Sequence, residues 1–309
     1  MHDYVIVLIN GIGAPPLTAG RVHDLYFGLV PQMCRSEINW LCAGEAAELP
    51  LRVEESVVAE GLADALATEL AIDAIDMVLL PAAGRRKQLL VADMESTIIA
   101  EECLDELAQE AGRGQDIADI TAKAMRGEIE FETALRDRVR LLQGMPVDSL
   151  ERLLDRLTPS PGAATLVATM RKHGAYTALV SGGFSYFAEP IAARLGFDCH
   201  FANRIGFSSG ILDGMVVGPI LDRQMKAGHL LDLARSRGLT PHQALAVGDG
   251  ANDVAMVTQA GLGVAYHAKP LLASVATAVI RHADLTALLY LQGYRQTEFV
   301  EADAKSGQG

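Results

Sequence analysis

The sequence predicts an α/β protein whose core is a doubly wound parallel sheet, with a helical cap inserted after the first core strand. Three features lead to this prediction. Short apolar runs that suit buried parallel strands recur along the chain, and each ends in a polar residue. The first of these runs is followed by a stretch with helical periodicity only. A separate amino-terminal segment has the element order βαββαβ and is expected to form a smaller α+β domain.

The amino-terminal segment, residues 1–82, is predicted to be a ferredoxin-like domain. Apolar runs and helical spacing place, in order, strand 4–10, helix 18–29, strands 38–42 and 49–53, helix 55–70 and strand 74–80. This βαββαβ order is that of a ferredoxin-like unit. The segment holds no obvious catalytic cluster, so we expect the chemistry to lie in the rest of the chain.

The first core strand is predicted at residues 89–92, four apolar residues that end at Asp93, with Glu95 two residues later. Two further apolar runs, YTALVS and ALAVGD, end at Ser181 and Asp249. Ligands of open α/β sheets bind just outside the carboxyl ends of the strands. The sequence therefore predicts a site at this edge of the sheet, with Asp93 at its centre.

The cap is predicted over about 105–157, where apolar residues recur at helical spacing. Arg138 interrupts one apolar stripe, which is formed by Phe131, Leu135 and Leu142. A buried or half-buried arginine is costly unless an anionic group meets it. That group is either a ligand or one of the many nearby acidic side chains, and the pattern alone leaves both readings open.

The core is predicted to resume after the cap and to extend to about residue 290, so that the second domain spans 88–290. Its expected elements are a helix to about 172, strand 176–181, a helix containing Pro190, a hairpin at 199–220, a helix from 226 to 237, strands at ALAVGD and LGVAYHA, and then helical stretches. The polar residues 295–309 are expected to form a disordered tail.

The composition narrows the class of protein. A chain of 309 residues exceeds the usual domain size of roughly 100–200 residues, which favours two domains. The formal net charge of −13 argues against a nucleic-acid or anionic-membrane surface, and no apolar run approaches the ~18 residues of a membrane span. The amino terminus is unlike a signal peptide, and the four cysteines are widely spaced. We therefore expect a cytoplasmic protein without disulfides or a zinc site.

The acids of the site suggest covalent catalysis with a metal ion. An ionised carboxylate such as Asp93 can attack phosphorus and form an aspartyl phosphate. Asp249 and Asp253 lie four residues apart in the turn GDGAND and offer oxygen ligands of the kind that magnesium prefers. The alternative for this segment is a tight turn without a ligand.

The remaining polar residues at the strand ends suit a phosphate group. Ser181 and the amide of Gly182, at an expected helix start, can hydrogen-bond a phosphate oxygen. Lys226 can neutralise the remaining charge, although it could also be a solvated helix end. Positioning combined with charge neutralisation is what phosphoryl transfer needs.

This constellation resembles the haloacid dehalogenase (HAD) superfamily of phosphatases. The first motif of the superfamily, DxDxT, is matched except at its second acid, where Glu95 stands. Its four motifs correspond in chain order to Asp93 with Thr97, Ser181, Lys226, and Asp249 with Asp253. The resemblance implies that Asp93 and Lys226 are catalytic, and that the cation is held by Asp93, Asp249, Asp253 and the backbone carbonyl of Glu95.

The closer resemblance, over about 88–285, is to the phosphoserine phosphatases within this superfamily. Their pattern DMDSTxIxxExxDELA corresponds to DMESTIIAEECLDELA here, and FExxLRxRVxLL corresponds to FETALRDRVRLL. The resemblance implies that Glu102 contacts the substrate, that Arg138 binds its carboxylate, and that Phe131 lines the pocket. The match to GDGANDxxM adds Asn252 to the substrate-binding residues. The amino-terminal domain looks like the ACT-type domain that often accompanies these enzymes.

The resemblance implies magnesium-dependent hydrolysis of L-phosphoserine, a small molecule, in serine biosynthesis. Glu95 is expected to protonate the leaving oxygen and then to activate water, although its additional methylene moves the carboxyl by roughly 1 Å. The alternatives are another small-molecule phosphatase, a phosphotransferase, or a serine-sensing regulatory protein with an impaired site. The sequence leaves the oligomeric state open, a homodimer included.

Overall fold

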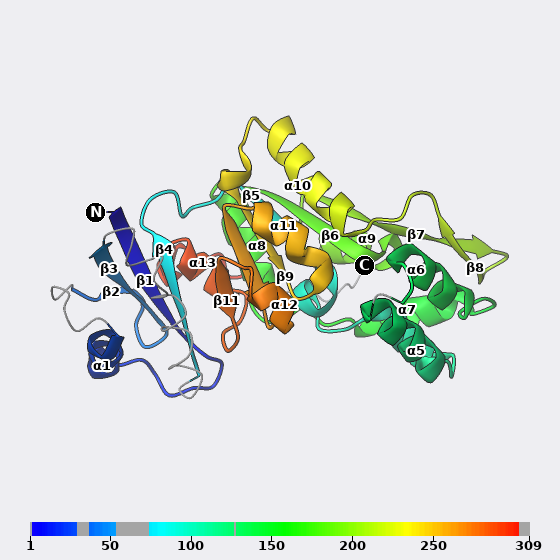
Figure 1. Cartoon of the computed structure of the whole chain (residues 1–309), viewed down its shortest axis with the longest axis horizontal. Helices are drawn as coiled ribbons and strands as arrows, with labels where there is room; N and C mark the ends of the chain where they lie inside the picture. The colour runs from blue at the N-terminus through cyan, green and yellow to red at the C-terminus, as the bar shows by residue number, and fades with distance from the viewer. Residues whose placement is uncertain (1, 30–36, 54–73, 127, 303–309) are drawn as a thin grey trace.

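The computed structural model describes residues 2–29, 37–53, 74–126 and 128–302. Figure 1 shows three parts along the longest axis of the molecule: an amino-terminal sheet at one end, a larger core sheet with helices in the middle, and a helical cap at the other end. Within the described part of the chain, no helix is both long and apolar enough to cross a bilayer.

The amino-terminal sheet has the strand order of a ferredoxin-like fold. Its elements are β1 (His2–Asn10), α1 (Ala19–Leu29), β2 (Asn39–Cys42), β3 (Ala46–Val53) and β4 (Ile75–Pro81). The order is β2-β3-β1-β4, and all neighbouring strands are antiparallel. This arrangement confirms the predicted fold class. The second predicted helix, 55–70, lies outside the described residues.

Strand β1 is buried on both faces. Ile6 and Leu8 pack in a cluster with residues of α1 and its approach, such as Val22. Val5, Val7 and the rest of the opposite face belong to a hydrophobic core that also includes residues of the larger core sheet, such as Leu90. The uninterrupted apolar run YVIVLI therefore reflects a sheet that is covered on both sides.

A buried carboxylate also joins the two sheets. Asp76 on β4, with 3% of its surface exposed, accepts hydrogen bonds from the backbone N–H groups of Arg281, His282 and Ala283 at 2.8, 3.0 and 2.9 Å. Three donors satisfy this acid in place of water. The contact places the end of the core sheet directly against β4.

The core sheet has seven strands in the order β11-β10-β9-β5-β6-β7-β8. Their bounds are β5 (Leu89–Ala92), β6 (Tyr176–Phe184), β7 (Cys199–Ser208), β8 (Ile211–Val217), β9 (Ala244–Gly248), β10 (Leu262–Tyr266) and β11 (Ala278–Ile280). All neighbouring pairs are parallel except β7 and β8. The doubly wound parallel core predicted from the sequence is thus confirmed.

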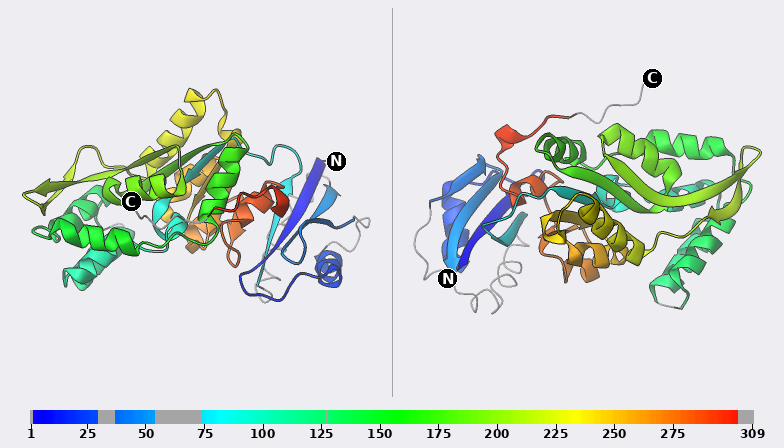
Figure 2. Two further views of the ribbon diagram at one scale, coloured as in Figure 1. Left: turned by 180° about the vertical axis from the view of Figure 1, so that it is seen from behind. Right: turned by 90° about the horizontal axis from the view of Figure 1, so that it is seen from above.

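Helices cover both faces of the core sheet, as Figures 1 and 2 show. Residues of α8 (Ala163–Lys172), α9 (Ser185–Leu195) and α13 (Ala287–Leu291) share a hydrophobic cluster with one face. Residues of α10 (Arg223–Ser236), α11 (Val254–Gln259) and α12 (Pro270–Ala273) form the cluster on the other face. This double cover explains why the central strands are wholly apolar.

The cap is inserted after β5, as predicted. It comprises α4 (Cys103–Glu110), α5 (Gly114–Met125), α6 (Phe131–Arg140) and α7 (Val147–Arg156). The β7–β8 hairpin extends beside it, and the guanidinium of Arg136 on α6 donates to the carbonyl of Val216 at 3.1 Å. The cap therefore contacts the core both through its own connections and through this hairpin.

The structure corrects two element boundaries next to the site. Strand β6 continues through Phe184, and α9 begins only at Ser185, so Gly182 lies in a strand and not at a helix start. Helix α10 begins at Arg223 instead of Lys226, because the Asp222 carboxylate accepts from the N–H groups of the first turn and caps the helix there.

Two further expectations near the carboxyl end were wrong. Residues after the LGVAYHA strand are not only helical, since β11 adds a short edge strand. The expected disordered tail is ordered up to residue 302, because Arg295 donates to the Trp40 carbonyl at 2.7 Å and the Val300 N–H donates to Thr169 Oγ1 at 2.8 Å. Residues 303–309 lie outside the described part.

Candidate active site

The carboxyl ends of three neighbouring strands bring the predicted site residues together. β5 lies between β6 and β9 and runs parallel to both. Asp93 follows directly after β5, and Asp249 follows directly after β9. The Asp93 N–H donates to the Val247 carbonyl at 3.0 Å, which extends the pairing of the two strands into the site. Both acids consequently emerge at the same edge of the sheet.

Lys226 reaches this edge from α10 and is almost completely buried. Its Nζ lies 2.8 Å from Asp93 Oδ1 and 2.8 Å from Asp253 Oδ1, and 1% of its side chain is exposed. Burial alone would lower the pKa of Lys226, but the attraction of Asp253 and Asp93 is stronger and raises it. Lys226 is therefore a permanently charged ammonium in the centre of the acids.

Asp93, Asp249 and Asp253 form a cluster in which one carboxylate oxygen of each residue lies within 4.8 Å of the others. All three are buried. Burial, followed by repulsion from Asp253, raises the pKa of Asp93, and burial raises the pKa of Asp249 to about 6. Three carboxylates around one ammonium leave an excess of negative charge. The donor set is entirely oxygen, so the cluster fits a hard divalent cation such as magnesium.

The three acids differ in how much of their hydrogen-bonding capacity is already used. Asp253 Oδ1 binds Lys226, and its Oδ2 accepts from the N–H groups of Asp249 and Gly250, each at 3.2 Å. Asp93 Oδ2 accepts only a long contact of 3.4 Å from Asn252 Nδ2, and Asp249 Oδ2 lies 3.6 Å from the Lys269 ammonium. Asp93 and Asp249 are thus better disposed to bind a cation than Asp253.

A tight turn directs Glu95 back into the site. Residues Met94–Ile98 form a π-type turn in which Ser96 has a left-handed backbone conformation with φ of 53°. The Glu95 carboxyl accepts a hydrogen bond from the Cys103 N–H at 2.9 Å. Burial, with a smaller contribution from Glu102, raises the pKa of Glu95 to about 7. A carboxyl that titrates near neutral pH is suited to donate and accept protons.

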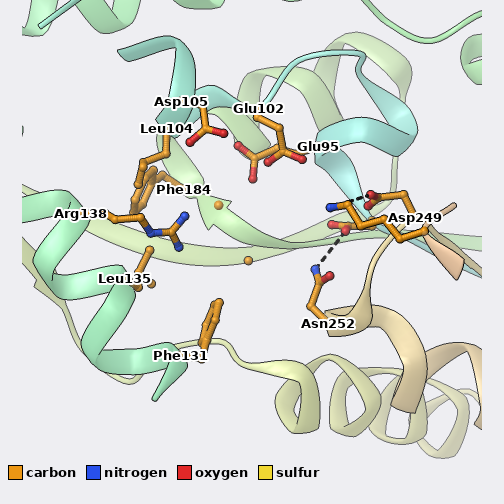
Figure 3. Close-up of a pocket in the computed structure, with 14 residues that line it drawn as sticks. Glu95, Glu102, Leu104, Asp105, Phe131, Leu135, Arg138, Phe184, Asp249 and Asn252 are labelled. Carbon is orange, nitrogen blue, oxygen red and sulfur yellow. Dashed lines mark hydrogen bonds and ion pairs between the residues drawn. The ribbon is translucent and has the colours of Figure 1, made fainter. Parts of the chain in front are cut away.

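A cavity of about 150 Å³ lies between these strand ends and the cap. Figure 3 shows Arg138 of α6 pointing into it, toward Glu102 and Glu95 on the other side. The predicted site residues that line the cavity are Asp93, Glu95, Glu102, Phe131, Arg138, Gly182, Asp249 and Asn252. Ser181, Lys226 and Asp253 are buried behind this lining.

Arg138 lines the cavity, but its side chain makes only long hydrogen bonds within the described residues. Its Nε donates to the Ala134 carbonyl and its Nη1 to Thr121 Oγ1, both at 3.4 Å. Among the described residues, no carboxylate forms an ion pair with it. Burial lowers the pKa of Arg138, yet a guanidinium remains charged at neutral pH. The local salt bridge considered as an alternative from the sequence is therefore not observed.

Ser181 is oriented by the backbone next to it. Its hydroxyl oxygen accepts from the Gly183 N–H at 2.9 Å, and its residue surface is fully buried. The carbonyl of Gly182 accepts from Asn203 Nδ2 at 2.7 Å, which fixes the strand at this point. Two hydrogen bonds thus hold the strand at this point, while Gly182 lines the cavity.

Several lining residues were missed by sequence reasoning. Asp105, Gly183, Phe184 and Lys269 also line the cavity. Lys269 comes three residues after strand β10, so the rule that predicted Asp93 and the other strand-end residues could have identified it too. Asp105 lies one helical turn from Glu102, a spacing that could have indicated a common face.

Fold and site together define the class of protein. The haloacid dehalogenase-like hydrolase family model matches residues 90–258, which is more than half of the chain. The protein therefore belongs to the haloacid dehalogenase-like hydrolase family. The predicted family resemblance is confirmed.

The chain is similar to phosphoserine phosphatases in particular. It is 44% identical over 216 residues to the phosphoserine phosphatase of Archaeoglobus fulgidus, covering 69% of this chain and 63% of that protein. It is 45% identical over 203 residues to that of Haemophilus influenzae, covering 66% and 65%. In both cases the match spans less than two thirds of the relative's length. The structure of a probable phosphoserine phosphatase from Vibrio cholerae has a TM-score of 0.76 and 33% identity, and covers 96% of this chain and 88% of that one.

Proposed function

We propose that the protein is a magnesium-dependent phosphoserine phosphatase, which hydrolyses L-phosphoserine to L-serine and phosphate in serine biosynthesis. The observation that carries the proposal is Arg138, a cation without a carboxylate partner among the described residues, which faces Glu102 across the cavity. A cation and an acid on opposite sides of a small cavity suit the two charges of an amino acid. The similar phosphoserine phosphatases support the same substrate.

The headgroup of the substrate would be bound by the cap side of the cavity. Arg138 can bind the carboxylate through two parallel hydrogen bonds. Glu102 can bind the ammonium, and its Oε1 already accepts a hydrogen bond of 2.7 Å from Ser96 Oγ, which restricts its orientation. Phe131, 38% exposed, would cover the aliphatic part of the substrate.

The phosphate would lie at the strand ends. The Gly182 backbone and Asn252 line the cavity next to Asp93 and are placed to hydrogen-bond phosphate oxygens. The Lys226 ammonium would offset the charge that collects on the phosphate and on Asp93. Ser181 would support this arrangement from behind, through its contact with the Gly183 N–H.

Two successive displacements would complete the reaction. The Asp93 carboxylate attacks phosphorus while the bond from phosphorus to the seryl oxygen breaks, and the protonated Glu95 gives that oxygen its proton. Glu95, now ionised, takes a proton from water as the water oxygen attacks the aspartyl phosphate. The bond between phosphorus and Asp93 then breaks, which returns both carboxyl groups to their initial states.

Magnesium, when bound, would polarise the phosphoryl group and offset its negative charge. We propose that Asp93, Asp249 and the backbone carbonyl of Glu95 hold it. Asp253, whose oxygens are occupied by Lys226 and by two N–H groups, would act by orienting the other groups.

Three expectations from the sequence remain part of the proposal. The first is the division into an ACT-type domain at 1–82 and a phosphatase domain at 88–290. The second is a cytoplasmic location, and the third is a homodimer. A nucleic-acid or membrane partner is not expected, given the net charge of −13.

Phosphate release from L-phosphoserine, with magnesium and with a chelator, tests the proposal. Phosphoethanolamine, which lacks the carboxylate, and p-nitrophenyl phosphate, which lacks the whole headgroup, serve as comparison substrates. We expect magnesium-dependent turnover with a clear preference for phosphoserine. Equal rates on all three esters would favour a general phosphatase, and product formation only with an added alcohol would favour a phosphotransferase. Serine binding without any turnover would favour the regulatory alternative.

A further inference from the structure

The Glu95 carboxyl lies between the first turn of cap helix α4 and the end of core strand β6. On one side, its Oε1 accepts from the Cys103 N–H at 2.9 Å. On the other side, a Cβ built on Gly183 would lie 2.5 Å from Glu95 Oε2. Only glycine at position 183 therefore leaves space for the carboxyl in this place. The group is confined between two elements of different parts of the fold.

The hydrogen bond to Glu95 uses a donor that the helix itself leaves free. Cys103 is the first residue of α4 and follows Glu102 at the N-cap. The first N–H groups of a helix have no carbonyl partner within the helix. The positive end of the helix dipole also favours a carboxylate at this position. The buried Cys103 side chain also helps to stabilise the ionised form of the same carboxyl.

The length of the side chain at position 95 determines whether these contacts form. An aspartate, as in the DxDxT pattern, would hold its carboxyl roughly 1 Å nearer to the main chain. The hydrogen bond to the Cys103 N–H is 2.9 Å long with glutamate, so the carboxyl of a shorter side chain would lie too far away to form it. Both contacts are therefore made by the end of the longer glutamate side chain.

We propose that the Cys103 N–H and Gly183 are positioning groups that hold the Glu95 carboxyl in its working place. The inference rests on the proposed function, because it concerns the residues that support its acid and base. It also links proton transfer to the cap, since the supporting N–H belongs to the first turn of α4. Neither group touches the reacting atoms in this proposal.

Cys103→Pro removes the supporting N–H with little disturbance of the helix. Proline is well tolerated at the first helical position. The preceding residue, Glu102, has an extended conformation, φ −101° and ψ 99°, outside the α region that a following proline disfavours. Cys103→Ala is the matched control, because it shortens the same side chain and keeps the N–H.

Gly183→Ala tests the opposite side of the carboxyl. Its backbone φ lies outside the left-handed region, so alanine is compatible with the backbone. The new methyl group would displace Glu95 Oε2. Each variant is made with glutamate and with Glu95→Asp, because the shorter side chain neither reaches the N–H nor meets the methyl group.

With glutamate at position 95, we expect Cys103→Pro and Gly183→Ala each to lower kcat for phosphoserine about 10–100-fold. With aspartate there, the same changes should lower kcat less than about threefold. Cys103→Ala should lose several times less activity than Cys103→Pro. The melting temperature of every variant is measured alongside, and if Cys103→Pro does not fold, Gly183→Ala decides the question.

Equal losses with glutamate and with aspartate would overturn the inference, because a merely structural effect does not depend on residue 95. Unchanged kcat in both variants would overturn it as well. If the parent protein does not hydrolyse phosphoserine, the proposed function is wrong. The same variants are then compared on p-nitrophenyl phosphate, where the dependence on residue 95 still decides the inference. Inactivity on both esters would overturn both.

Discussion

The Lys226 ammonium lies 2.8 Å from an oxygen of Asp93 and 2.8 Å from an oxygen of Asp253, with almost no exposed surface on any of the three side chains. One cation thus joins the expected nucleophile to the acid that closes the GDGAND turn. Because Asp93 follows β5 and Asp253 lies in the turn after β9, Lys226 also links these two segments.

Lys226→Met should abolish turnover and destabilise the protein. Breaking a buried ion pair by removing one partner typically costs 3–5 kcal/mol, since it leaves charge without compensation. Added magnesium should recover part of the lost melting temperature, because the acids would again face a cation. The check is thermal unfolding with and without magnesium, together with kcat. A variant with parental kcat would contradict the role of Lys226.

Asp93→Asn should abolish hydrolysis of phosphoserine, because an amide is a poor nucleophile. The substitution also removes one charge from a cluster whose burial disfavours ionisation, so the variant should remain folded. Phosphate release and circular dichroism of the purified variant test this. Substantial turnover by the folded variant would show that another group attacks phosphorus.

Arg138→Ala should impair hydrolysis of phosphoserine far more than hydrolysis of p-nitrophenyl phosphate. The guanidinium is expected to bind a carboxylate that only the first substrate carries. A loss of about 10–100-fold in kcat/KM for phosphoserine corresponds to one charge-assisted pair of 1.5–3 kcal/mol. Arg136→Ala, on the same helix but bonded to the β7–β8 hairpin, is the control. Equal losses on both substrates would indicate a structural arginine.

Glu95→Gln should slow turnover by about 10²–10⁴-fold, the usual contribution of general acid–base catalysis. Its amide can neither protonate the leaving oxygen nor take a proton from water. Glu95→Asp should retain substantial activity, because it keeps a carboxyl at the position. The rates of both variants, measured where chemistry limits turnover, decide this. Parental turnover of the Gln variant would require a different proton donor.

The same Gln variant should change how stability depends on pH. The pKa of Glu95 rises from 4.5 to about 7 on folding, so the folded protein holds its proton more tightly than the unfolded chain. The resulting stability is fully present below about pH 4.5 and is lost as pH rises through about 7. Glutamine does not titrate, so the Glu95→Gln variant does not lose this stability as the pH rises. Without metal at pH 8, the variant should therefore be more stable than the parent protein by about 1–2 kcal/mol after allowance for solvent screening. Melting curves at pH 5 and pH 8 in chelator would refute this if the difference between the two proteins stayed constant.

The core of the site could be predicted because its residues follow the ends of buried strands. Parallel strands of similar length bring their last residues to one edge of the sheet. The closeness of Asp93 and Asp249 can therefore be predicted from the sequence alone. Arg138 could be predicted because a charge interrupts an apolar stripe. These signals depend on side-chain type and spacing, which a sequence displays directly.

Other features depend on contacts that side-chain types do not display. The support of Glu95 comes from the Cys103 backbone N–H, and every residue except proline has such a group. Gly182 was expected at a helix start, but β6 continues through Phe184, and the space beside Gly183 is filled by the Glu95 carboxyl. The polar residues after Tyr294 are ordered because Arg295 and Val300 find partners on distant segments.

The double-sided burial of β1 determines whether the amino-terminal unit can be detached. A core produced without residues 1–82 would turn the apolar surface around Tyr290 and Leu288 toward water, together with three N–H groups that Asp76 now satisfies. Such surfaces promote aggregation. We therefore expect shortened versions of this chain to be insoluble. Exchange of this unit with that of a relative should succeed only when the facing surface is transplanted with it.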